Sequence, residues 1–182
     1  MGRGGQEVQR RQVFGNRGMI FLTVGTLYPF DRLVRIVDSA VAEGHVKEAV
    51  FAQIGDTINK PSHIEYVARL ETDVYERYFC QASAVIGHAG IGTITMALRR
   101  RKPLLVVPRE TQYGELVSDH GNERGVETAE AFAREGYVLM ARTPDEVVAK
   151  LVELRSFVPR ERHCNSKAIV TFIRQYLHSL EK

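Results

Sequence analysis

Two patterns of hydrophobic residues alternate along the chain. Short runs of β-branched and aromatic residues that end near glycine or proline predict buried strands. Longer segments with apolar residues three and four positions apart predict amphipathic helices. The predicted strands cover residues 19–24, 48–54, 63–68, 84–86, 103–107 and 137–140. The predicted helices cover residues 31–43, 74–81, 93–101 and 125–135, a segment that opens at 143–144, and a C-terminal segment at 169–180.

Strands and helices alternate throughout, which predicts the α/β class. The expected fold is a Rossmann-like, mostly parallel sheet sandwiched by helices and joined by right-handed crossovers. Polar residues predict how three of the helices begin. Asp31 and Asp73 are interpreted as caps of the first two helices, and Thr143 as the cap of a helix with Pro144 at its first position.

Composition places the chain among globular proteins with a single domain. It has 182 residues, of which 44% are hydrophobic and 26% charged. Residues 1–18 carry four arginines against Glu7 alone, so they account for the whole net charge of +3. The remainder is formally neutral, which gives no broad electrostatic case for binding nucleic acid.

The first 18 residues lack the apolar core of a signal peptide. We interpret them as a disordered leader or tag, with Met19 as a candidate natural start and residues 19–182 as the folded domain. No run reaches the roughly 18 apolar residues of a membrane span. Without a secretory signal, Cys80 and Cys164 are expected to be reduced thiols in the cytoplasm.

A glycine-rich loop is the strongest candidate for chemistry. Residues 87–93 form the sequence Gly-His-Ala-Gly-Ile-Gly-Thr between a predicted strand and a predicted helix. Gly90 and Gly92 allow backbone N–H groups to approach an anion, and a helix N-terminus adds partial positive charge. The loop lacks a Walker A motif and the spacing of a dinucleotide fingerprint. An ordinary tight turn therefore remains the alternative to a diphosphate site.

Three further loops follow predicted strands. They contain Gly25–Thr26, Gly55–Asp56 and residues 108–122. Because ligands bind at the carboxyl ends of strands in open α/β folds, we expect all four loops to line one edge of the sheet.

Several motifs with consistent spacing carry a resemblance to a known family. The glycine loop is followed by Ala97-Leu98, the run 102–109 (Lys-Pro-Leu-Leu-Val-Val-Pro-Arg), Gly114-Glu115 and Asp119-His120. Before it lie Thr23-Val24-Gly25-Thr26, Phe30-Asp31-Arg32-Leu33-Val34 and Gln53-Ile54-Gly55. From about Met19 to Tyr137 the chain resembles the C-terminal half of family 28 glycosyltransferases. Within that family it is most similar to single-domain subunits, those of exopolysaccharide synthesis and the catalytic subunit of the dolichol-pathway N-acetylglucosaminyltransferase.

The resemblance implies the donor half of an inverting GT-B glycosyltransferase that uses a UDP-sugar and needs no metal or other cofactor. It implies that residues 90–93 hold the donor diphosphate through backbone N–H groups and a hydroxyl, and that residues 109–120 face the sugar and nucleotide. The expected donor-binding residues are Gly25, Thr26, Gln53, Gly55, His88, Gly90, Ile91, Gly92, Thr93, Arg109, Glu115, Asp119, His120 and Asn122.

His88 and Glu115 are the candidate catalytic residues, each with a structural alternative. His88 either assists the donor diphosphate or orients the loop. Glu115 either hydrogen-bonds hydroxyls of the donor or pairs with Arg109. An inverting transfer needs a base beside the acceptor hydroxyl; no residue here is assigned to it, and a partner chain is a candidate source. The sugar stays open, because Arg109 would suit glucuronate and Asn122 would suit N-acetylglucosamine.

Two departures from the family pattern support a rival hypothesis. Met96 stands where related proteins carry a ribose-binding glutamate. The pair Asp119-His120 lacks the glutamine that usually follows, so Asn122 is its candidate replacement after a short insertion. The leading hypothesis is a hexosyl- or glucuronosyltransferase subunit that acts on a polyprenyl-diphosphate-linked acceptor. The rival is a non-catalytic nucleotide-binding module derived from such a subunit.

The length fits one of the two domains of a GT-B enzyme. We therefore expect a partner, and the resemblance implies that it is a membrane-anchored subunit that supplies the acceptor half and recruits this chain to the cytoplasmic face of a membrane. The amphipathic segment at 169–180 either docks on that partner or packs on its own domain. The basic run 99–102 is either a solvated helix end or a contact for anionic lipid.

Overall fold

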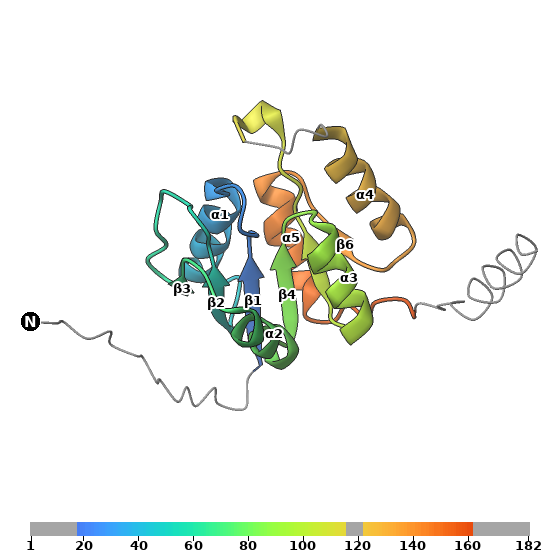
Figure 1. Cartoon of the computed structure of the whole chain (residues 1–182), viewed down its shortest axis with the longest axis horizontal. Helices are drawn as coiled ribbons and strands as arrows, with labels where there is room; N and C mark the ends of the chain where they lie inside the picture. Colours follow the sequence, from blue (N-terminus) through green and yellow to red (C-terminus); the bar gives the residue numbers. More distant parts are fainter. Residues whose placement is uncertain (1–17, 116–121, 162–182) are drawn as a thin grey trace, which may run out of the picture.

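The computed structural model describes residues 18–115 and 122–161, which form an α/β domain built around one sheet (Figure 1). Six strands of the described ranges run parallel in the order β3-β2-β1-β4-β5-β6. The strands are β1 (Met19–Thr23), β2 (Ala49–Gln53), β3 (Glu65–Val67), β4 (Ala84–Gly87), β5 (Leu104–Val106) and β6 (Leu139–Met140). The predicted α/β, Rossmann-like fold class is confirmed.

Helices cover both faces of the sheet. The helices are α1 (Asp31–Ala42), α2 (Thr72–Gln81), α3 (Ile91–Arg100), the 3-10 helix η1 (Thr111–Tyr113), α4 (Asn122–Arg134) and α5 (Pro144–Leu154). The buried hydrophobic side chains of α1 and α5 belong to one core cluster, and those of α2, α3 and α4 belong to another. Figure 1 shows η1 and the start of α4 beyond the carboxyl ends of the strands.

The alternation of side chains along β1 connects these two cores. Ile20 and Leu22 belong to the cluster under α1 and α5, whereas Phe21 belongs to the other cluster, because successive side chains of a strand point to opposite faces. Phe21 is fully buried, and its ring centroid lies 6.3 Å from that of Phe51 on β2 and 6.4 Å from that of Phe79 on α2. Burial on both faces explains why the strands appear in the sequence as continuous apolar runs.

The strand order reverses at β1. The chain extends the sheet from β1 through β2 to β3, and then on the other side through β4, β5 and β6. Thr23, the last residue of β1, lies opposite both Gln53 of β2 and Gly87 of β4. The segments that follow these three residues therefore leave the sheet at one edge, at the kind of reversal point where open α/β folds bind ligands.

The structure corrects two predicted helix caps. Asp31 is not a cap, because Phe30 holds the N-cap position of α1 and the Asp31 carboxylate accepts the backbone N–H of Asn59 at 2.7 Å. Asp73 is not a cap either, because Glu71 precedes α2 and Asp73 lies inside its first turn. Aspartate is favoured both at the cap and in the first turn, where its charge complements the helix dipole, so the sequence did not separate the two positions.

Two other helices begin earlier than predicted. α3 begins at Ile91 rather than residue 93, so Gly92 lies within its first turn. α4 begins at Asn122 rather than Gly125, so residues interpreted as an inserted loop are helical. Glycine is a poor helix former, and its presence at both starts moved the predicted boundaries inward.

The predicted cap at Thr143 is confirmed, because its hydroxyl accepts the N–H of Glu146 within a capping box. The predicted leader, up to residue 17, and the predicted helix at 169–180 lie outside the described residues. Within the described ranges, no helix is both long enough and apolar enough to cross a membrane.

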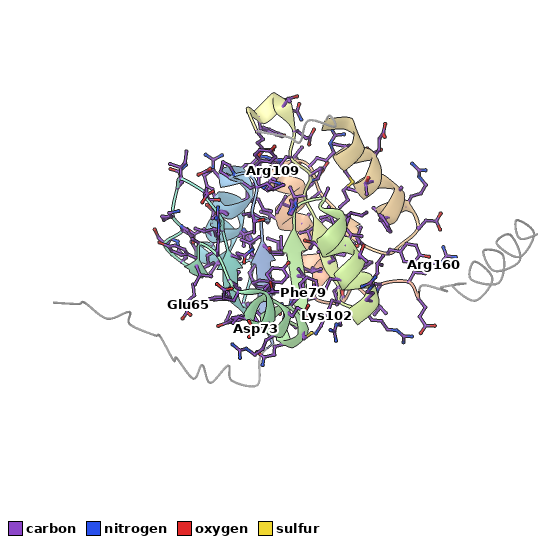
Figure 2. All side chains as sticks on the ribbon, viewed as in Figure 1. Glu65, Asp73, Phe79, Lys102, Arg109 and Arg160 are labelled. Carbon is purple, nitrogen blue, oxygen red and sulfur yellow. The ribbon has the colours of Figure 1, made fainter. Side chains whose placement is uncertain are left out.

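Phe79, labelled in Figure 2, anchors α2 to the sheet. We expect Phe79→Ala to lower the free energy of unfolding by about 3–5 kcal/mol, because it removes a fully buried ring and leaves a cavity. Urea unfolding followed by circular dichroism measures the change. Val158→Ala, at an exposed position, is the control and should change the same quantity by less than about 0.5 kcal/mol. Equal losses in the two variants would contradict this account of the core.

Candidate functional site

Four loops meet at the carboxyl edge of the sheet. They follow β1, β2, β4 and β5 and contain the predicted residues Gly25, Gly55, His88 and Arg109. A Cβ added at Gly55 would lie 3.2 Å from the carbonyl oxygen of Gly25, and one added at Gly25 would lie 2.7 Å from Cε1 of His88. The first three loops are therefore in direct contact, and Figure 2 shows Arg109 beside them at the same edge.

The His88 imidazole is held between two glycine backbones. On one side is Gly25, whose φ of +79° lies in the left-handed region that favours glycine. On the other side is Gly90, where an added Cβ would overlap Nε2 of the ring. The packing of a single side chain therefore requires glycine at both positions, independently of any ligand.

The first turn of α3 presents backbone donors at this edge. Gly90 is the N-cap residue in an extended conformation, and no side chain caps the helix. The first N–H groups of an uncapped helix lack intrahelical acceptors, and the helix dipole adds partial positive charge there. Apart from the neighbouring residues and the backbone of α3 itself, no described atom lies within 4 Å of the place that a Cβ at Gly92 would occupy. This open helix start fits an anion such as a phosphate.

The start of α3 is fixed closely to the sheet. A Cβ added at Gly87, the last residue of β4, would lie 3.1 Å from Cγ2 of Thr93 and 3.4 Å from the carbonyl oxygen of Thr23. Thr93 itself is buried. The backbone donors of this turn are therefore held in one position relative to β1 and β4.

The His88 side chain is uncharged at neutral pH. Burial, and to a smaller extent the positive charge of Arg109, lower the pKa of His88 from the usual 6.5 to about 4, against the opposing effect of the Thr23 main chain. Its Nδ1 is buried and has no hydrogen-bond partner among the described residues. A neutral imidazole carries one N–H, so the Thr23 main chain and a bound ligand would compete for a single donor.

The Arg109 guanidinium is directed at the loop between β1 and α1. Its Nη2 donates to the carbonyl oxygens of Val24 at 2.7 Å and Tyr28 at 2.8 Å, and its Nε donates to that of Pro29 at 3.4 Å. Its Cζ also lies 4.6 Å from the centroid of the Phe30 ring. Burial lowers the pKa of Arg109 to about 10, so the group stays charged at neutral pH.

Glu115 pairs with Arg32 and not with Arg109, which corrects the alternative considered from the sequence. Arg32 donates through Nε to Oε1 at 2.7 Å and through Nη2 to Oε2 at 3.0 Å. The backbone N–H of Glu110 donates to Oε2 at 2.8 Å. The Arg32 and Glu115 side chains are only 6% and 9% exposed. Both carboxylate oxygens of Glu115 are thus engaged inside the fold.

Arg32 is important to this edge but was not singled out from the sequence. It donates to the carbonyl oxygens of Arg142 at 2.7 Å and Pro108 at 2.8 Å, and its Cζ lies 4.1 Å from the Tyr113 ring centroid. It therefore joins α1 to the segment after β5 and to the loop before α5. The available signal was an arginine on the apolar face of a predicted helix, which is rarely buried unless it is paired.

A second acid that was not predicted, Glu110, is held by Arg142. Arg142 donates through Nε at 3.1 Å and through Nη2 at 2.5 Å, and Gln112 donates at 2.9 Å. The bonds from Arg142 lower the pKa of Glu110, and the same pairing raises the pKa of Arg142. Together, the Arg142–Glu110 and Arg32–Glu115 ion pairs hold the loop after β5 against the rest of the domain.

The remaining predicted residues differ in their surroundings. Gln53 is buried, and its Oε1 accepts the backbone N–H of Leu70 at 3.0 Å, so its side chain serves the fold. Thr26 and Ile91 are exposed at the carboxyl edge. Met96, at the position for which the resemblance implies an acid, is half-buried and packs against the core under α2, α3 and α4.

Three predicted residues are not placed. Asp119, His120 and the side chain of Asn122 lie outside the described part of the chain. Within residues 18–115 and 122–161, no group of three His, Cys, Asp or Glu side chains is arranged to hold a metal ion. That the site works without a metal stays a prediction.

The sequence matches a known family over most of its length. The profile of the glycosyltransferase family 28 C-terminal domain matches residues 19–178. One curated relative is the UDP-N-acetylglucosamine transferase subunit ALG13 of Cryptococcus neoformans var. neoformans serotype D, which is 40% identical over 76 residues. This match covers 41% of the present chain and 34% of the relative, so it spans about a third of the relative's length.

Solved structures resemble the fold. A glycotransferase of kitacinnamycin has a TM-score of 0.60 at 20% identity, covering 86% of this chain and 39% of that one. MurG of Acinetobacter baumannii has a TM-score of 0.56 at 15% identity, covering 88% and 51%. The NMR structure of ALG13 has a TM-score of 0.53 at 18% identity, covering 83% and 92%. These likenesses confirm that the domain has the fold of one half of a GT-B glycosyltransferase.

The pKa of His88 predicts how stability depends on pH. Its folded-state pKa of about 4 lies below the usual 6.5, so between these values the unfolded chain binds a proton that the folded chain does not. The free energy of unfolding should therefore fall as the pH drops from about 6.5 towards 4. Three acids, Asp38, Glu110 and Glu146, have lowered pKa values. The stability that they contribute is lost mainly below their ordinary pKa values of 3.8 to 4.5, and therefore outside this window.

Urea unfolding at pH 7 and pH 5 measures this dependence. We expect His88→Gln to lose less of its unfolding free energy between the two pH values than the wild type does, because glutamine does not titrate. The comparison uses the slope with pH and not the absolute stability, so a general destabilisation by the substitution does not affect it. Equal slopes in the two proteins would refute the burial of a neutral His88.

Proposed function

This chain belongs to the family of the glycosyltransferase family 28 C-terminal domain, and on that premise we propose that it is the donor-binding, catalytic subunit of a two-subunit inverting glycosyltransferase. In this proposal it takes a sugar from a UDP-sugar and transfers it to a polyprenyl-diphosphate-linked acceptor. The observation that carries the proposal is the open first turn of α3 at the reversal point of the sheet, with free space beside Gly92.

The proposed donor site uses the main chain for the diphosphate. The backbone N–H groups at 91–93 donate to the phosphate oxygens, and the single N–H of His88 adds a hydrogen bond from the opposite side. Negative charge grows on the leaving diphosphate as the glycosidic bond breaks. Fixed donors at a helix N-terminus stabilise that charge without reorganising, which is the electrostatic contribution to catalysis proposed here.

The acceptor hydroxyl needs a general base, and the two candidate residues of this chain are poorly suited to that role. The pKa of His88, about 4, makes it a weak base at neutral pH. Both oxygens of Glu115 already accept hydrogen bonds from Arg32 and from the Glu110 main chain. We therefore assign the base to the partner subunit, His88 to a hydrogen bond with the donor, and Glu115 to positioning of the loop after β5.

The sugar we favour is N-acetylglucosamine. The proposal of glucuronate relied on a free cation at Arg109, but the described hydrogen bonds of that guanidinium go to carbonyl oxygens of the β1–α1 loop. The name of the matched fungal relative, a UDP-N-acetylglucosamine transferase subunit, supports the same choice.

The proposed partner subunit carries the acceptor half and docks at the carboxyl edge. Four large apolar side chains of that edge, each on a segment that follows a different strand, are exposed. They are Leu27 (80% exposed), Ile58 (78%), Ile91 (61%) and Tyr113 (40%). They lie on segments at the same edge of the sheet as the open start of α3, so we expect a domain that covered them to enclose a donor bound there. In this proposal the partner is membrane-anchored and brings the chain to the cytoplasmic face of a membrane.

A non-catalytic nucleotide-binding module is the second candidate function. Its support is Met96, which packs against the core at the position where related proteins carry a ribose-binding acid. Both candidates bind UDP, so they differ only after reconstitution with the partner. Sugar transfer by the reconstituted pair supports the transferase, whereas UDP binding without any transfer supports the module.

Gly92 provides the direct test of the donor site. The position has an ordinary helical backbone and open space beside it, so we expect Gly92→Leu to fold and to be at least as stable as the wild type. The added side chain occupies the space in front of the first turn of α3, so UDP binding should be abolished. Isothermal titration calorimetry with UDP and thermal unfolding measure the two effects. Wild-type affinity in the variant would exclude this turn as the diphosphate site.

The exposed apolar residues provide the test of docking. We expect the double variant Leu27→Glu and Ile58→Glu to keep its stability, because both side chains are exposed, and to lose co-purification with the membrane-anchored partner. Val152→Glu, at an exposed position on α5, is the matched control and should keep the partner. Efficient transfer to a lipid-linked acceptor by this chain alone would contradict the need for a partner.

A further inference from the structure

One arginine closes the loop between β1 and α1. The same nitrogen of Arg109, Nη2, donates to the carbonyl oxygens of Val24 and Tyr28, at 2.7 Å and 2.8 Å, and so joins the two ends of the intervening turn. Its Nε reaches the next carbonyl, that of Pro29, at 3.4 Å. The planar guanidinium also rests on the buried ring of Phe30. Such a rigid fork fixes a backbone segment more firmly than a single ammonium group can.

The loop that Arg109 closes is in direct contact with the candidate donor site. Gly25 follows Val24 directly, and its backbone packs against the His88 ring on one side and approaches Gly55 on the other. The far side of the same ring touches Gly90, the N-cap residue of α3. A continuous path of contacts therefore leads from Arg109 through the Gly25 backbone and His88 to the start of α3.

The direction of the guanidinium separates two roles for Arg109. A residue that binds the donor would present its N–H groups to the space in front of α3. Three described hydrogen bonds instead lead to main-chain oxygens of the β1–α1 loop. Figure 2 labels Arg109 at the carboxyl edge of the sheet.

We propose that Arg109 is a positioning residue that holds the β1–α1 loop against His88 and thereby orients the imidazole towards the donor diphosphate. This inference rests on the proposed function, because it assumes that UDP binds at the start of α3. It differs from a direct role, since Arg109 acts through Gly25 and His88 without touching the donor.

The test combines a measurement on the free protein with one on UDP binding. In the ligand-free full-length chain, Arg109→Gln should speed hydrogen–deuterium exchange of backbone amides in residues 25–30 and leave exchange in β1 and β4 unchanged. The same variant should weaken UDP binding by about tenfold. Arg109→Lys should lose both properties as well, because it keeps the positive charge but not the fork.

A double-mutant cycle distinguishes positioning from a merely structural effect. If Arg109 acts through His88, the effects of Arg109→Gln and His88→Asn on UDP affinity should be less than additive. Arg100→Gln, an exposed position at the far end of α3, is the control and should change neither measurement. Additive effects, unchanged exchange at 25–30, or full UDP affinity in the lysine variant would each overturn the positioning role. Absence of UDP binding by the wild type would instead overturn the proposed function, while the exchange measurement would still report on the loop.

Discussion

The carboxyl edge of this domain depends on the buried guanidinium of Arg32. Its hydrogen bonds reach Glu115, Pro108 and the Arg142 main chain, so one side chain joins α1 to two loops that are far apart in the sequence. A charge removed from water is tolerated only when its donors are paired. These bonds hold the segment after β5 in a fixed position, and the same segment carries Arg109, which reaches the β1–α1 loop.

Side chains and main chain have different tasks at this edge. The charged side chains of Arg32, Glu115 and Arg109 are engaged within the fold, where they hold loops in place. In the proposed donor site, the donors offered to a ligand are the backbone N–H groups at the start of α3, which no side chain caps. If the proposed function holds, the selectivity of this site for a diphosphate follows from main-chain donors that are fixed in one geometry.

Much of this architecture was predictable from the sequence, and the rest depended on long-range pairing. Apolar runs and helical periods predicted the sheet, and the glycine loop with its neighbours identified the family. Glycine and aspartate left helix starts uncertain by up to three residues, since both are favoured near a helix end as well as at it. The partners of Arg32 and Arg109 could not be predicted, because they are carbonyl oxygens and acids brought near only by folding.

The close contact between Gly87 and Thr93 has a kinetic consequence. In the proposed function, the start of α3 packs closely against β1 and β4, so the donors that bind the diphosphate would keep their positions after the sugar has left. On the same premise, release of the spent nucleotide would depend on the β1–α1 loop and on the proposed partner that covers Leu27. The residence time of the product would then be set by the loop and the partner, and the chemical step by the first turn of α3.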